Sequence, residues 1–158
     1  MRVGELLAIY LNDHLAGATA GVELARRLRA SNEDDPEFGP ALTEVCAEIE
    51  ADRETLKAVM DRFGVGQGKL KPLAAVLGER LGRLKLNGRL WGYSPLSRLE
   101  ELELLQTGVV GKRRLWRALE HSHAGDLPGF DLGALAERAT EQLRRLEALH
   151  LKAAALAL

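Results

Sequence analysis

Three side chains in the sequence could together hold a metal ion or a polar ligand. His14 falls on an otherwise apolar helical stripe, Asp52 interrupts a second stripe, and Glu103 flanks a third. An imidazole and carboxylates are ordinary ligands for iron and other divalent metals. Antiparallel pairing of the first two segments brings His14 to about the level of Glu54, roughly one turn from Asp52. A metal-binding or redox site built on these residues is therefore one hypothesis.

The preferred interpretation of the same residues is structural. A buried imidazole needs a hydrogen-bond partner, so His14 held by a carboxylate would fix the register of two helices. Glu103 and Gln106 could add oxygens to the same layer, and Arg53 could neutralise them. A small rotation of the second helix exchanges Asp52 for Arg53, and the sequence leaves that alternative open. We expect a buried ionic layer with no cofactor, and keep iron or another divalent metal as the alternative.

The remaining reactive side chains form no recognisable catalytic motif. Cys46, the single cysteine, falls on an apolar face and is interpreted as a small core residue. His121 and His123 are two positions apart, which points them to different sides of a helix. His150 is assigned to the edge of the core. The sequence therefore favours a non-enzymatic protein without catalytic residues.

Apolar spacing predicts the helices that position these residues. Aromatic residues make up only 4% of the chain, while leucine, alanine, glutamate and arginine dominate, which favours helices over sheets. Apolar residues recur every three or four positions over 5–30, 40–63, 96–123 and 132–156, with a shorter helix over 72–86. We expect one all-α domain over residues 1–158, built from two antiparallel hairpins and a long helix-containing crossover. The last two stripes are Leu99, Leu102, Leu105, Val109, Trp116 and Leu119, then Leu135, Ala139, Leu143, Leu146, His150 and Ala153.

Four glycines interrupt the first and third of these long helices, namely Gly17, Gly21, Gly108 and Gly111. A glycine inside a helix costs about 1 kcal/mol relative to alanine. We expect two helices to approach closely at these positions, which would account for the missing side chains. A faint repeat, in which Gly-Val precedes Arg-Arg-Leu in both helices, supports the division into two hairpins.

The stretches YLNDHLAGATAGVELARR, EIEADRETL and GRLKLNGRLWGYSPLSRLEELE resemble an uncharacterised bacterial branch of the ferritin-like superfamily. The resemblance implies a four-helix bundle with a long crossover between its second and third helices. Di-iron members of that superfamily carry a glutamate on two helices and Glu-x-x-His on the other two. Here the corresponding strings are Glu50-x-x-Arg53 and Glu141-x-x-Arg144. Because arginine stays protonated and has no lone pair for a metal, an iron-storage or di-iron oxidase role is not expected.

The charge and hydropathy of the chain limit the kinds of molecule that we expect it to bind. The formal net charge of −1 provides no global field that would attract nucleic acid or an anionic membrane. The one basic stretch, 69–89, is interpreted as solvated or paired with the acidic SNEDDPE loop, so nucleic acid is not expected as a partner. No segment has the roughly 18 to 20 apolar residues of a membrane span. We expect a cytoplasmic structural or protein-interaction module, with a homodimer through an apolar helix face as one arrangement.

Overall fold

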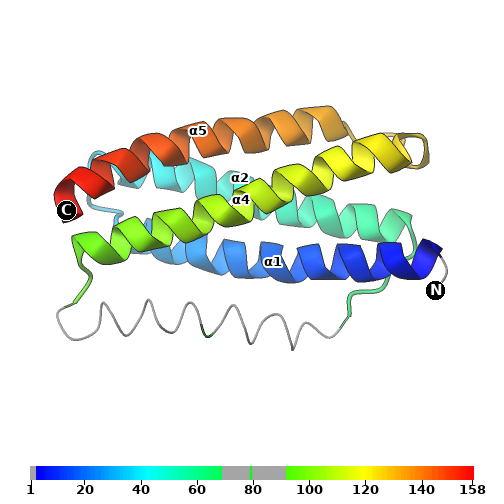
Figure 1. Ribbon diagram of the computed structural model, residues 1–158, viewed down its shortest axis with the longest axis horizontal. Coiled ribbons are helices and arrows are strands. Elements are labelled where there is room, and N and C mark those ends of the chain that lie inside the picture. The colour runs from blue at the N-terminus through cyan, green and yellow to red at the C-terminus, as the bar shows by residue number, and fades with distance from the viewer. Residues whose placement is uncertain (1–2, 69–78, 80–91) are drawn as a thin grey trace.

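The fold is all-helical over the residues that the computed structural model describes, 3–68, 79 and 92–158. Its helices are α1 (Val3–Ser31), α2 (Gly39–Arg62), α4 (Pro95–His123) and α5 (Leu132–Ala157), with a 3-10 turn, η1 (Ala124–Asp126), after α4 (Figure 1). The four long helices predicted from apolar spacing are confirmed, and each end lies within two residues of its predicted position. The predicted helix over 72–86 and the basic stretch 69–89 lie outside the described residues, apart from Glu79.

Capping residues fix where two of the helices begin. Ser94 Oγ accepts a hydrogen bond from Ser97 N over 3.1 Å, and Pro95 occupies the first turn of α4. At α5, Asp131 Oδ1 accepts a hydrogen bond from Ala134 N over 2.9 Å. These starts set the register in which α4 and α5 present apolar residues to the core.

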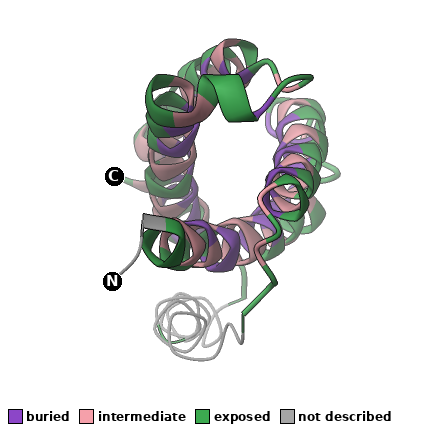
Figure 2. Ribbon diagram, turned by 90° about the vertical axis from the view of Figure 1, so that its right-hand side faces the viewer, coloured by how far each residue is buried: buried purple, intermediate pink, exposed green. Residues whose placement is uncertain are grey.

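The helices pack as two antiparallel hairpins, α1 with α2 and α4 with α5 (Figure 1). Viewed from the end of the bundle, they surround a common core with their buried positions facing inward (Figure 2). α4 also packs beside α1 and runs in the opposite direction, whereas α2 and α4 run the same way. The ion pair between Arg27 and Glu101 sets the α1–α4 register. Counting along both helices from that pair places Gly17 opposite Gly111 and Gly21 about opposite Gly108.

The predicted stripe of α4 is confirmed, whereas that of α5 is only partly right. On α5, Leu143 and His150 are half-buried, and Gln142 and Leu149 are buried instead. The buried face of α5 thus drifts across the predicted stripe, since Ala136 is buried in place of Leu135, one residue later, whereas Gln142 and Leu149 lie one residue earlier. This drift carries the Gln142 amide into the core. All six predicted positions of α4 are buried, namely Leu99, Leu102, Leu105, Val109, Trp116 and Leu119.

Candidate functional site: a buried ion cluster beside an apolar slot

Asp52 is the centre of a buried ion cluster that joins three helices. The residue lies on α2 between the two apolar clusters of the core and is only 2% exposed. Lys112 Nζ on α4 donates to Asp52 Oδ2 over 2.5 Å, and Arg138 on α5 donates to Asp52 Oδ1. A buried carboxylate is stable only with such partners. The alternative that the sequence left open is thereby decided, since Asp52 faces the core and Arg53 does not.

The Gln142 side chain completes the cluster. Its Oε1 accepts a hydrogen bond from Lys112 Nζ over 2.5 Å, and its Nε2 donates to Asp52 Oδ2 over 3.1 Å. The same Nε2 donates to Glu48 Oε2 over 2.9 Å, and Arg145 lies 2.6 Å from that oxygen. The amide therefore serves as both acceptor and donor, and it fixes the position of the lysine ammonium against Asp52.

Lys112 is the most deeply buried cation of the cluster, with 14% of its side chain exposed. Burial lowers the pKa of its ammonium because desolvation penalises the charged form, and Asp52 opposes that shift. An ammonium carries three hydrogens, and Asp52 and Gln142 engage two of them. One hydrogen of Lys112 is left without an acceptor in the described part of the chain.

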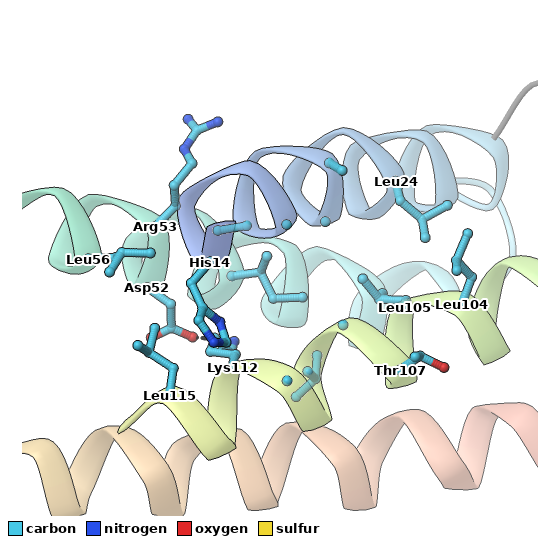
Figure 3. A pocket seen from close by; sticks show the side chains of 18 of the residues that line it. His14, Leu24, Asp52, Arg53, Leu56, Leu104, Leu105, Thr107, Lys112 and Leu115 are labelled. Carbon is cyan, nitrogen blue, oxygen red and sulfur yellow. Dashed lines mark hydrogen bonds and ion pairs between the residues drawn. The ribbon is translucent and has the colours of Figure 1, made fainter. Parts of the chain in front are cut away.

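A cavity of about 330 Å³ lies between α1 and α4 beside the ion cluster, and we call it the α1–α4 slot. Figure 3 shows His14, Asp52 and Lys112 together at one end, whereas Leu24, Leu104 and Leu105 lie toward the other. The ionisable groups labelled there are thus gathered at one end of a mostly apolar space, and the Thr107 hydroxyl lies toward the other end. The residues that give the slot its character are His14, Gly17, Gly21, Gly108, Gly111 and Lys112.

The helical glycines do not bring α1 and α4 into close contact, so that prediction is wrong. No described atom outside the local backbone lies within 4 Å of a Cβ built on any of the four. None has a positive φ, since the described glycines with φ > 0 are Gly64, Gly92 and Gly129. Facing glycines, Gly17 opposite Gly111 and Gly21 about opposite Gly108, therefore leave the slot open along both of its long walls.

Trp116 adds an unsatisfied donor to the same site. The residue is fully buried and lines the slot, and its indole Nε1 has no hydrogen-bond partner within the described residues. Buried indole N–H groups normally find an acceptor. Trp116 follows Lys112 by four positions, so the two side chains occupy adjacent turns on one face of α4.

His14 is brought to Asp52 as expected, but it is not the hydrogen-bonded core residue that the sequence predicted. It lines the slot with its ring edge-on to Tyr10 at a centroid distance of 4.6 Å. It makes no hydrogen bond to any other described residue, Asp52 included. Burial lowers the pKa of His14 because it disfavours the imidazolium, and nearby Asp13 opposes that shift. The imidazole is therefore neutral at pH 7 and keeps both ring nitrogens for other partners.

The structure does not assemble the predicted metal-ligand set. Glu103 lies away from the slot, where its Oε1 is 3.0 Å from His150 Nε2. Gln106 does not join the predicted ionic layer either, because its Nε2 donates to the Leu146 carbonyl over 3.2 Å. Within the described ranges, no group of three or more histidine, cysteine, aspartate or glutamate side chains could hold a metal ion. Of the three candidates, only His14 and Asp52 share a site.

The remaining charged candidates form ion pairs near the surface. Arg53 extends away from the slot (Figure 3) and its Nε is 3.3 Å from Glu54 Oε1, so it does not neutralise a layer with Glu103 and Gln106 as predicted. Glu50 pairs with Arg26 over 2.6 Å, and Glu141 pairs with the neighbouring Arg144. The glutamates of the two strings compared with Glu-x-x-His, Glu50 and Glu141, thus contribute no carboxylate to the core.

The other sequence candidates lie outside this site. Cys46 is fully buried in the apolar core, as predicted. His123 contacts Phe63 edge-on and pairs with Asp126 at 3.0 Å, whereas His121 is exposed. These residues belong to the core or to the surface rather than to a reactive cluster.

The sequence interpretation missed the partners of Asp52, although two of them left a signal. Lys112 occupies the one skipped turn of the α4 stripe, between Val109 and Trp116. A cation at a core position predicts a buried anion opposite it, and Asp52 interrupts the α2 stripe in the same way. Gln142 is the corresponding polar interruption on α5, once the buried face is correctly centred.

Comparison with protein-family models, curated proteins and solved structures finds no match for this chain. Among the described helices, none is both long enough and apolar enough to cross a membrane. The function must therefore be inferred from the site itself.

Proposed function

We propose that this chain is a non-catalytic binding protein that takes an apolar small molecule into the α1–α4 slot. The observation that carries the proposal is the slot itself, which four glycines leave open and in which His14, Asp52 and Lys112 lie together at one end. Its volume of about 330 Å³ lies in the range of small-molecule pockets. The interior of a protein is normally packed as densely as an organic crystal, so an open slot of this size calls for an explanation such as a ligand.

The cost of the four glycines supports this function. Each glycine destabilises a helix by about 1 kcal/mol relative to alanine. At these positions neither backbone conformation nor close packing requires the missing side chain. Larger residues would fill the slot, so the glycines are best explained by the space that they leave.

The ion cluster supports binding rather than catalysis. Asp52 accepts hydrogen bonds from three side chains, those of Lys112, Arg138 and Gln142. These hydrogen bonds engage both carboxylate oxygens, Oδ1 and Oδ2. We assign the cluster the role of positioning Lys112 at the end of the slot.

We further propose that the chain path is ferritin-like. The parallel course of α2 and α4 and the long connection between them, residues 63–94, support a crossover along the bundle. A protein partner, a homodimer and a cytoplasmic location stay predictions from the sequence.

Binding of a neutral, apolar naphthylamine dye tests the proposed function. We expect the dye to fluoresce more strongly with the wild-type protein at a stoichiometry of one. A Gly108→Leu variant should bind about tenfold more weakly or worse, because leucine fills the slot. Gly4→Leu is the matched control, since Gly4 is also a helical glycine in open surroundings but does not line the slot. Equal binding by both variants and the wild type would place the dye elsewhere and contradict the proposal.

A further inference from the structure

We infer that the ligand of the α1–α4 slot is a medium-length alkyl or aryl carboxylate, whose carboxylate accepts hydrogen bonds from Trp116 Nε1 and Lys112 Nζ. This inference rests on the proposed function and names the chemistry of the ligand. Both donors belong to residues that line the slot and sit one turn apart on α4. Both have a hydrogen with no acceptor in the described part of the protein.

The positions of the two donor residues on α4 favour an acceptor with two oxygens. Residues four apart on a helix have Cβ atoms about 5–6 Å apart and their side chains lean the same way. A carboxylate offers two oxygens and accepts only, which matches two donors and requires no donor in return. A hydroxyl or an amine would add a hydrogen-bond donor of its own beside two donors that already lack an acceptor.

Charge at the polar end favours an anion. Asp52, Lys112 and Arg138 together carry one formal positive charge in excess. At the rim, Asp13 also lines the slot, whereas Arg53 is paired with Glu54. An anionic head group would neutralise the excess in a poorly solvated place, where charge-assisted hydrogen bonds are strong. His14, neutral at pH 7, adds a polar wall that does not repel a carboxylate.

The apolar part of the slot defines the tail. From Lys112 back to Leu104 the slot follows eight residues of α4, which is about 12 Å of helix. Its walls there are glycine backbone and the side chains of Leu24, Leu104, Leu105 and Thr107, whose hydroxyl donates to the Glu103 carbonyl. A narrow apolar space of this length fits an extended alkyl chain or a small aryl-alkyl group with no polar atom along it.

Calorimetric titration with decanoate, decanol and decylammonium tests the head group. We expect decanoate to bind about tenfold or more tightly than decanol, because hydrogen bonds to a charged group are the stronger ones. Decylammonium should bind most weakly, since its charge opposes that of Lys112. A Lys112→Met variant that stays folded should lose the preference for decanoate and keep binding of decanol.

Nitrogen-15 labelling of tryptophan provides a readout in the unmutated protein. The chain has two tryptophans, so the Trp116 indole signal is assigned by its loss in Trp116→Phe. On addition of decanoate, the Trp116 indole proton should move downfield as it gains an acceptor. Decane should leave the Trp116 proton without such a shift.

The outcomes separate this inference from the proposed function. If decanol competes as well as decanoate and the Trp116 proton does not move downfield, the carboxylate assignment is wrong and the slot still binds apolar molecules. If none of these compounds nor the naphthylamine dye binds, both proposals are overturned. Decanoate binding that survives Gly108→Leu unchanged would also overturn the assignment, because it places the ligand outside the slot.

Discussion

Two buried carboxylates, Asp52 and Glu101, tie the helices together in different ways. Glu101 on α4 is held by Arg27 of α1 at 2.6 Å and accepts a hydrogen bond from the Tyr93 hydroxyl over 3.3 Å. This ion pair holds α1 against α4 at one end of their shared contact, which we call the α1–α4 seam. Asp52 instead joins α2 to α4 and α5. The polar residues that α1 contributes to the slot beside it are Asp13 and His14, neither of which bonds to Asp52. The seam is therefore closed where α1 supplies an arginine and open where it supplies glycines and a histidine.

Removal of Asp52 should have the largest effect. Asp52→Ala leaves Lys112 buried without its counter-ion, so we expect the free energy of unfolding to fall by about 3–5 kcal/mol. Glu101→Ala should cost less, about 1–3 kcal/mol, because Arg27 is a quarter exposed and can turn to solvent. Urea denaturation with an unchanged m-value measures both losses. Equal losses would show that Asp52 is no more deeply integrated than Glu101.

Alanine at the slot glycines should stabilise the protein. Gly21→Ala and Gly108→Ala add a methyl group where no described atom crowds it, so each should raise the free energy of unfolding by about 1 kcal/mol. Gly39→Ala is the contrasting variant, because its Cβ would lie 2.8 Å from the Glu33 carbonyl oxygen. That substitution should destabilise the protein in the same urea titration. Destabilisation by the two slot substitutions would instead indicate close helix packing.

The sequence predicted those features of the structure that leave a periodic pattern of apolar residues, and it missed those that do not. The helices and the α4 stripe were predictable because burial repeats every three to four residues. The glycines were misread, since a missing side chain has the same sequence signature at a close contact and at an open slot. The partners of Asp52 depended on the rotation of α5, and an error of one residue there hid Gln142. The unsatisfied Trp116 Nε1 leaves no trace in sequence, because Trp116 fits an apolar stripe.

The two regions should also differ in pH dependence. Burial lowers the pKa of His14 below 6.5, so the unfolded state binds more protons there and stability falls as pH drops below that value. Burial raises the pKa of Glu101 above 4.5 despite Arg27, so its contribution has the opposite sign and stability falls as pH rises through that window. Relative to wild type, His14→Gln should remove the first slope and Glu101→Gln the second. Urea midpoints between pH 4 and pH 7 measure these differences, and slopes of one sign for both residues would contradict the comparison.

The most direct test of the central claim, that the α1–α4 slot is a ligand site, is thermal unfolding of wild type and Gly108→Leu with and without decanol. A ligand that binds only the folded state raises the Tm, and the stabilisation grows as the logarithm of one plus the ratio of free ligand concentration to Kd. We predict that decanol raises the Tm of the wild type and leaves that of Gly108→Leu unchanged, although the variant is at least as stable without ligand. An equal rise in both proteins would contradict the claim, because binding would then not depend on the space between α1 and α4.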